Sequence, residues 1–243
     1  MLNDKTYLLH IESSCPYLSV SLSLANNILQ TVEIKEKNKH SETIGVVIKG
    51  IIDNCNIMTS DIKAVSISKG PGSYTGLRVG VSFAKAFCFV NNIPLISVSS
   101  LRALAQTFYL EYKNKINSEN INIFLCPTIQ AHKNIVYFAI FDSHLKRITQ
   151  DEANEVNENL LKQFNTIINN KKIIFIGSGA KIFLNLKDFF YNPEFFENVY
   201  PKSEALVNYA FEKYTNKNYE NLINFKPNYI TNFIPNLYKK KSL

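Results

Sequence analysis

The stretch from residue 64 to residue 90 constrains this chain more than any other. A short β-branched segment, Ala64–Ser68, is followed by a loop that holds four of the chain's eight glycines and then by an apolar run long enough for a helix. Because glycine tolerates positive φ and proline holds φ near about −65°, residues 70–72 (Gly-Pro-Gly) predict a tight turn. Ser73 or Thr75 is predicted to cap the helix by accepting a hydrogen bond from a free backbone amide.

One face of this predicted helix carries only small side chains, which recur every fourth residue: Gly76, Gly80, Ala84 and Cys88. A bulky stripe runs beside it, formed by Phe83, Phe87 and Val90. Glycine inside a helix costs about 0.5–1 kcal/mol relative to alanine, so two glycines on one face require a compensating contact. We expect that contact to come from another helix of this chain or from another subunit.

A glycine loop between a strand and a helix can also hold phosphate with its backbone amides. A P-loop requires Gly-Lys-Ser/Thr at its end, whereas Lys69 precedes the glycines here. The dinucleotide fingerprint would need Gly-x-Gly-x-x-Gly at the start of the helix, directly after the strand. Neither spacing fits, so turn formation and close packing are the favoured interpretation, and phosphate binding is the weaker alternative.

The loop and helix resemble the signature of the TsaB (YeaZ) family, bacterial proteins needed to make threonylcarbamoyladenosine at position 37 of tRNAs that read codons beginning with A. The resemblance lies in the run Gly70-Pro71-Gly72-Ser73-Tyr74-Thr75-Gly76-Leu77-Arg78-Val79-Gly80, followed by Ala84-Lys85-Ala86. Shorter similarities extend along nearly the whole chain: Glu12-Ser13-Ser14, Lys39-His40-Ser41, Pro127-Thr128-Ile129, Gly177-Ser178-Gly179-Ala180 and Pro227-Asn228-Tyr229. The candidate motif-loop residues are Gly70, Pro71, Gly72, Ser73, Thr75, Gly76 and Arg78.

This resemblance implies a fold and a set of partners. The fold would be α/β, two-lobed and actin-like (ASKHA, ribonuclease H-like), with a mixed sheet and helices in each lobe and a degenerate nucleotide cleft. The chain would be a non-catalytic subunit that scaffolds the catalytic paralogue TsaD, works with the small ATPase TsaE and forms a homodimer when alone. It would contact tRNA only through that complex. ATP and metal would be held by the partner subunits, with no cofactor in this chain.

Two helices are predicted to carry the partner surface. The first begins at Ser41, with Glu42 in its first turn, where the helix dipole favours an acidic residue. Its apolar residues have helical spacing, yet Gly45, Val46 and Gly50 leave the other side poor in charge, so this helix is expected either to lie deep in a core or to meet a partner. The resemblance places the interface on this helix and on the one after the glycine loop. Periodicity alone does not separate partner-facing from core-facing positions. The predicted interface residues are Ile44, Val47, Ile48, Ile51, Gly76, Gly80, Ala84 and Phe87.

The first part of the chain predicts a β-meander at residues 6–12, 18–24 and 28–34. In residues 18–24, leucine or valine alternates with serine, so the apolar side chains share one face. Nucleotide-binding actin-like proteins place an aspartate and glycines in the first hairpin. This chain has Glu12-Ser13-Ser14-Cys15-Pro16 there, with no glycine to let a phosphate approach, so we interpret it as a structural hairpin.

A second β-meander is predicted at residues 121–127, 135–142 and 145–150, and it echoes the first as duplicated lobes would. Residues 113–122 are polar and rich in asparagine, which favours a linker. The predicted division is an N-terminal lobe of residues 1–106, which carries the glycine motif and the partner helices, and a C-terminal lobe of residues 107–243. Further elements are expected at 158–169 (helix), 172–177 (strand), 180–190 (helix) and 203–214 (helix).

The sequence contains no complete catalytic set: no paired carboxylates, no Ser/His/Asp arrangement and no Cys/His cluster at recognisable spacing. His40 lacks a second histidine four residues later, so we interpret it as a cap or surface residue rather than a metal ligand. The alternative function is an ATP-dependent small-molecule kinase or a glycoprotease of the actin-like superfamily. Glu12 alone is thin support for it.

Composition bears on compartment and on RNA binding. No apolar run reaches the ~18 residues of a membrane span and no signal-peptide core is seen, so we expect a cytoplasmic protein that does not enter a membrane. Four widely spaced cysteines predict buried free thiols: Cys15, Cys55, Cys88 and Cys126. The net charge of +7 is spread over both halves, which favours a shared, weak attraction to tRNA. His132 and Lys133, where the family usually has two arginines, and the Lys239–Lys241 tail are weaker candidates for RNA contact.

Overall fold

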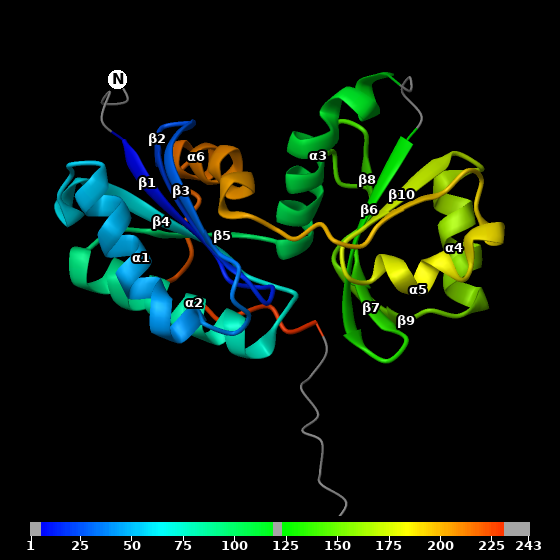
Figure 1. Cartoon of the computed structure of the whole chain (residues 1–243), viewed down its shortest axis with the longest axis horizontal. Helices are drawn as coiled ribbons and strands as arrows, with labels where there is room; N and C mark the ends of the chain where they lie inside the picture. Colours follow the sequence, from blue (N-terminus) through cyan, green and yellow to red (C-terminus); the bar gives the residue numbers. More distant parts are fainter. Residues whose placement is uncertain (1–5, 119–122, 231–243) are drawn as a thin grey trace, which may run out of the picture.

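The computed structural model describes residues 6–118 and 123–230, which form two lobes built around separate sheets (Figure 1). In the first lobe the strand order is β3-β2-β1-β4-β5. Its strands are β1 (Tyr7–Glu12), β2 (Leu18–Leu24), β3 (Asn27–Ile34), β4 (Ile62–Ser68) and β5 (Leu95–Val98). In the second lobe the order is β11-β10-β6-β7-β9, and β8 pairs with β6. Its strands are β6 (Ile123–His132), β7 (Ile135–Phe138), β8 (Phe141–Asp142), β9 (Glu152–Glu155), β10 (Lys172–Ile176) and β11 (Glu194–Phe196).

The two sheets follow one plan. In each sheet an antiparallel meander forms one side, and the first strand of that meander pairs in parallel with a later strand, which in turn pairs in parallel with the edge strand. This repetition confirms the predicted two-lobed fold with a mixed sheet in each lobe, although the two halves share no repeated sequence. The third strand of the second meander is β9, not residues 145–150, because that segment forms only an isolated bridge between Phe141 and Arg147.

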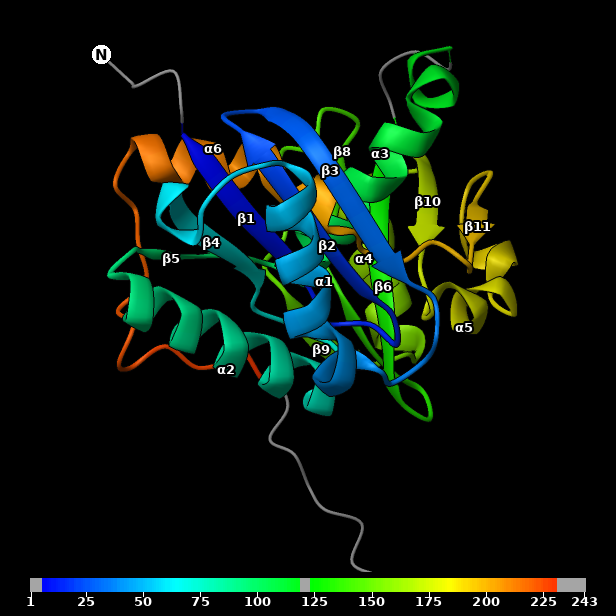
Figure 2. The ribbon, with the colours of Figure 1, turned by 60° about the vertical axis from the view of Figure 1, so that its left-hand side comes forward.

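The helices cover both faces of the first sheet. Helices α1 (His40–Asn54) and α2 (Tyr74–Asn91) lie on one face, and α6 (Val207–Thr215) lies on the other (Figure 2). The remaining helices are α3 (Ser100–Ser118), α4 (Glu158–Ile168) and α5 (Ala180–Leu184), with short 3-10 turns η1 (Thr59–Asp61), η2 (Lys187–Phe189) and η3 (Ser203–Leu206). Within the described residues no helix is long and apolar enough to cross a membrane.

Strand β2 shows why both faces of the first sheet are closed. Its apolar residues pack under α1 and α2, as the alternation predicted. Its serines are buried too, and the hydroxyls of Ser19 and Ser21 hydrogen-bond to Ser203 Oγ of η3 at 2.7 and 2.5 Å. Buried hydroxyls need partners, and the return of the chain at η3 supplies them. Strand β2 therefore lies between two other strands and is covered on both faces.

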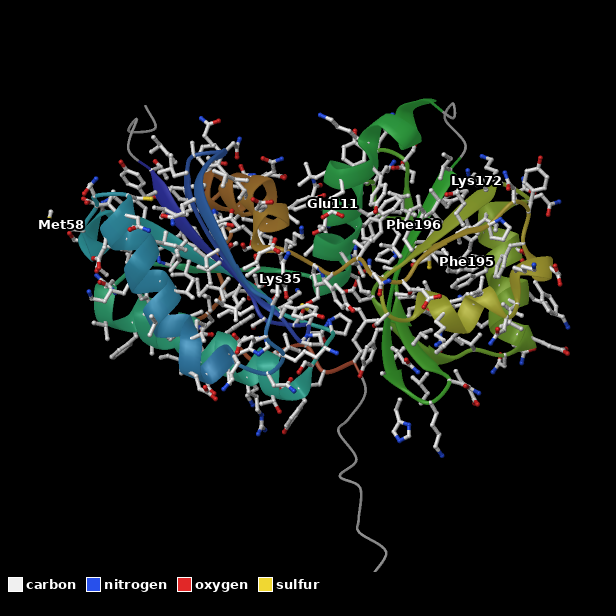
Figure 3. The ribbon with its side chains drawn as sticks, in the orientation of Figure 1. Lys35, Met58, Glu111, Lys172, Phe195 and Phe196 are labelled. Carbon is white, nitrogen blue, oxygen red and sulfur yellow. The ribbon has the colours of Figure 1, made fainter. Side chains whose placement is uncertain are left out.

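The second lobe has an aromatic core. Phe138, Phe164, Phe175 and Phe183 are fully buried between the sheet and helices α4 and α5. Phe195 packs on this side, whereas its neighbour Phe196 packs on the other side against Phe108 of α3 (Figure 3). Successive residues of a strand point to opposite faces, so β11 contributes one phenylalanine to each layer.

The lobe boundary differs from the predicted one at two places. Residues 113–118 belong to α3 rather than to a linker, and Leu104 and Phe108 of α3 pack into the second lobe. Near its end the described chain returns to the first lobe, where Ala210 and Phe225 join its core. We therefore propose a discontinuous division: residues 6–98 and 203–228 in one lobe and the residues between them in the other.

Two further elements differ from expectation. The helix predicted at residues 180–190 is five residues of α5 followed by η2, and the one at 203–214 begins as η3 before α6. All four cysteines are free, and three are buried as predicted, while Cys55 is half-buried. Burial raises the pKa of the Cys15 and Cys88 thiols to about 12, so both remain protonated at neutral pH.

Candidate functional site

The glycine loop joins β4 to α2 and is held by backbone hydrogen bonds to several distant segments. Gly70 has φ of +104°, a conformation that favours glycine. Its amide donates to Ser100 Oγ (3.1 Å), and its carbonyl accepts from the Ser100 amide (2.9 Å). Ser73 caps α2 by accepting from the Gly76 amide at 3.2 Å, so of the two predicted caps Ser73 is the one used. Thr75 is exposed, and Arg78 is exposed with its guanidinium 4.2 Å from the centre of the Tyr74 ring.

The small-residue face of α2 packs against the loop that follows β1. A side chain at Gly76 or Gly80 would overlap Ser13, and the Ser73 amide donates to the Ser14 carbonyl at 2.7 Å. The close contact predicted from another helix or subunit is therefore made by the chain's own Ser13 and Ser14. The weaker prediction, that this loop holds phosphate, loses support because these residues occupy the space beside the loop.

The segment near the end of the described chain also belongs to this site. The Asn228 amide donates to the Lys69 carbonyl at 2.6 Å, and the Tyr229 ring lies 5.1 Å from the Tyr74 ring. Lys85 Nζ donates to the carbonyls of residues 223 and 225, each at 3.0 Å. Short motifs at residues 84–86 and 227–229, far apart in the sequence, thus pack together around the glycine loop.

Glu12 lies beneath this loop and does not reach the surface. Its Oε1 accepts from the Ser14 amide (2.7 Å), the Ser14 hydroxyl (2.5 Å) and the Ser68 hydroxyl (2.9 Å). Among the described residues, Glu12 Oε2 and Ser13 Oγ have no hydrogen-bond partner. Burial raises the pKa of the Glu12 carboxyl, against the opposing effect of these hydrogen bonds. Glu12 thus holds the β1–β2 turn in place, and it is not positioned to bind a ligand in the cleft.

A cavity of about 440 Å³ lies between the lobes, next to the β1–β2 turn and the glycine loop. None of the described residues that line it is charged. From the first lobe the lining comes from residues 14–16 and 72–74, and from the second lobe from residues 129–131, Tyr137 and Ser178. Magnesium sites use carboxylates, and phosphate sites use cations or open glycine loops, so this neutral cavity fits neither well. We call it the neutral cavity.

Six of the eight predicted interface residues are buried in the chain itself. They are Ile44, Ile48, Ile51, Gly76, Gly80 and Ala84. The isoleucines and Ala84 belong to the core between α1, α2 and the first sheet. Only Val47 and Phe87 remain partly exposed. Both helices form where the sequence predicted them, but the broad apolar stripe and the small-residue face are the sides turned inward.

The apolar surface that remains accessible on these helices lies at other positions. Val46 is 73% exposed on α1, and Phe89 and Val90 are 78% and 80% exposed near the end of α2. Met58, which follows α1, is 67% exposed at the outer edge of the lobe (Figure 3). Phe89 was missed because it fell on neither stripe of the predicted helix. We call Val46, Val47, Phe87, Phe89 and Val90 the exposed helix surface.

The remaining candidates are placed as follows. His40 is buried, contrary to the surface alternative, and its Nε2 lies 3.1 Å from the Tyr17 carbonyl. His132 and Lys133 are exposed at the β6–β7 turn, outside the neutral cavity. Lys239–Lys241 lie outside the described residues.

Comparison with known proteins gives matches over most of the chain. A family profile described as "TsaD: tRNA N6-adenosine threonylcarbamoyltransferase" matches residues 27–226. The tRNA threonylcarbamoyladenosine biosynthesis protein TsaB of Buchnera aphidicola (from Acyrthosiphon pisum) is 28% identical over 232 residues, which cover 93% of this chain and 97% of that protein.

Two further matches define the limits of the likeness. The tRNA N6-adenosine threonylcarbamoyltransferase of Clostridioides difficile is 33% identical over 122 residues, which cover 44% of this chain and 36% of that enzyme. The structure of YeaZ from Pseudomonas aeruginosa superimposes with a TM-score of 0.75 at 17% identity, covering 92% of this chain and 99% of that one. At this identity, the second match supports the fold alone.

Proposed function

The chain belongs to the tRNA N6-adenosine threonylcarbamoyltransferase (TsaD) family, and we propose that it acts as a non-catalytic subunit in the threonylcarbamoylation of adenosine 37 in tRNAs that read codons beginning with A. The observation that carries this proposal is the match, over nearly the full length of both chains, to a protein named for tRNA threonylcarbamoyladenosine biosynthesis. The match to the named transferase covers only about a third of that enzyme, which supports a related but different role.

The neutral cavity supports a role without chemistry. It offers no carboxylate or cation from the residues that line it, and Glu12 is turned inward by three hydrogen bonds. A phosphoryl-transfer or metal-dependent site in this cavity would need such groups in its lining. We therefore propose that ATP and metal are held by the partner subunits TsaD and TsaE. On this proposal tRNA is contacted only within the complex.

The exposed helix surface is the proposed contact with TsaD. Its residues lie on α1 and α2, whose inner faces pack into the core and fix the outer face rigidly. Gly45 of α1 approaches Phe83 of α2 closely enough that an added side chain would lie 3.7 Å from the ring, so the two helices form one surface. Large exposed apolar side chains on such a surface are typical of protein interfaces. The same surface would form the homodimer when TsaD is absent.

Co-purification with a TsaD protein tests this surface. Val46→Asp and Phe89→Asp introduce a charge at side chains that are mostly exposed, so the fold should remain intact. Each substitution should sharply reduce co-elution with TsaD and lower the yield of modified tRNA in a reaction reconstituted with TsaE. Charged substitutions at Gly80 or Ala84, which the sequence alone would suggest, would disturb the core instead.

The matched control is Tyr191→Asp, because Tyr191 is an apolar side chain 65% exposed on the second lobe. This variant should co-elute with TsaD as the wild type does. Wild-type co-elution of both α1 and α2 variants would refute the proposed surface. Incubation with Mg-ATP addresses the alternative function: hydrolysis or phosphoryl transfer by the isolated chain would favour a kinase-like enzyme over a scaffold.

A further inference from the structure

A second cavity between the lobes is polar and shares no lining residue with the neutral cavity. Its volume is about 580 Å³, within the range of small-molecule sites. Lys69 and residues 97–99 line it at the carboxyl ends of β4 and β5. Arg102 lines it from α3, and the second lobe contributes Arg147, Gln150 and Asp151. In α/β proteins, ligands bind outside the carboxyl ends of parallel strands. We call this the basic cavity.

Four cations line the basic cavity: Lys69, Arg102, Arg147 and Lys213. Two carboxylates, Asp151 and Glu212, line it as well, and Asp151 pairs with Arg147 at 2.5 Å. Within residues 6–118 and 123–230, no carboxylate lies within ion-pair distance of the other three cations. The cavity therefore gathers three positive charges from three separate elements without direct neutralisation.

Two of these cations are held in place by groups that leave most of their donors available. The Arg102 guanidinium lies 4.6 Å from the centre of the Tyr209 ring and 5.1 Å from that of Phe141. One of its N–H groups donates to the Leu145 carbonyl at 3.3 Å, out of five that a guanidinium carries. Lys213 Nζ donates to the Ser97 carbonyl at 2.8 Å, and an ammonium has two further protons to donate.

The cations also act on one another. Burial, together with the charges of Lys69 and Arg102, lowers the pKa of Lys213 against the opposing effect of Glu220 and Glu212. Like charges that share a partly buried site disfavour the charged form of each group. An anion in the cavity would remove this repulsion.

We propose that the basic cavity binds a small phosphorylated anion, with Lys69, Arg102 and Lys213 as the groups that contact its phosphate. A phosphate group presents several acceptor oxygens and more than one negative charge, which matches a planar guanidinium and two ammonium groups. Because Lys69 and Lys213 lie on the first lobe and Arg102 on the helix that packs with the second, the anion would hold the two lobes together. This site is independent of the docking surface proposed above.

Calorimetric titration of the full chain with pyrophosphate tests the proposal. The wild type should show saturable binding that weakens as salt rises. Lys69→Gln and Lys213→Gln should each weaken it by about tenfold or more, the effect of losing one charge-assisted hydrogen bond. Lys63→Gln is the matched control, because Lys63 lies on β4, the strand that Lys69 follows, but is exposed and outside the cavity, and this variant should bind as the wild type does.

Two comparisons keep the test decisive. Gln130→Ala changes the neutral cavity only, so weaker pyrophosphate binding by this variant would place the anion there and overturn the proposal. The proposal would also be overturned if an RNA oligonucleotide bound through Lys69 and pyrophosphate did not bind, because the cavity would then be a site for a nucleic-acid backbone. Absence of saturable pyrophosphate binding by the wild type, or binding by both lysine variants as tight as that of the wild type, would also overturn the proposal. Thermal unfolding of each variant confirms that the binding protein is folded.

Discussion

His10 provides a direct test of how the serine-lined face of the first sheet is held. It is fully buried on β1, with Nδ1 2.7 Å from Ser66 Oγ and Nε2 2.8 Å from Ser23 Oγ. The Ser23 hydroxyl donates to the Ala25 carbonyl at 2.9 Å, so it accepts from His10, and the ring proton lies on Nε2. Nδ1 then accepts from the Ser66 hydroxyl. This network holds a neutral imidazole.

Burial lowers the pKa of His10 from 6.5 to about 3. In the unfolded chain the ring takes up a proton as pH falls below 6.5, whereas in the folded chain it does not. The contribution of His10 to stability is therefore complete above that pH and is lost progressively as pH falls toward 3. Each pH unit below 6.5 lowers the free energy of unfolding by about 1.36 kcal/mol. At about pH 5, which is about 1.5 pH units below 6.5, the free energy of unfolding is therefore about 2 kcal/mol lower than at about pH 8.

Urea unfolding of the wild type and of His10→Gln at about pH 8, 6.5 and 5 measures this loss. The variant should be less stable at high pH, because it disturbs a packed network, but its stability should fall by about 2 kcal/mol less than that of the wild type between pH 8 and pH 5. His132→Gln, which removes an exposed histidine, should leave the wild-type dependence unchanged. If His10→Gln and the wild type lost equal stability on acidification, the neutral buried imidazole would be refuted.

Two further predictions concern the loop beneath the glycine motif. Gly80→Ala should destabilise the fold by about 1–3 kcal/mol in urea unfolding, because its new methyl group would overlap Ser13. Gly50→Ala is the control, and it should be neutral or stabilising because there is open space around Gly50. Equal effects of the two substitutions on the free energy of unfolding would contradict the packing argument. Because the pKa of Glu12 is raised in the folded state, the wild type should lose stability as pH rises above 4.5. Glu12→Gln should therefore gain stability relative to the wild type between about pH 4.5 and pH 8. A constant difference in the free energy of unfolding between the two proteins over that range would show that Glu12 does not titrate as inferred.

Much of the fold follows from local pattern. The alternation in residues 18–24, the strand-loop-helix order of residues 64–90 and the repeated meanders each specify an element, because side-chain direction has a period of two in strands and 3.6 in helices. The two sheets have the predicted mixed architecture. The α1 and α2 helices and the Ser73 cap were also located from sequence.

The sequence pattern did not determine which residues each helix face contacts. The spacing of Gly76 and Gly80 indicates a close neighbour, and only the fold shows that this neighbour is Ser13 rather than a partner helix. Likewise, α3 passes through the segment predicted as a linker, because its apolar face finds the second sheet.

The sequence by itself determined most of the elements, the glycine turn and the small-residue face of α2. The tertiary structure decided which helix faces remain exposed, that β2 is covered on both faces, and that Lys69, Arg102 and Lys213 line one cavity. The physical reason is that periodicity depends on neighbours three or four positions apart. The exposed faces of the helices and the clustering of charges depend on segments that only the folded chain brings together. Residues 69 and 213, for example, are 144 positions apart in the sequence.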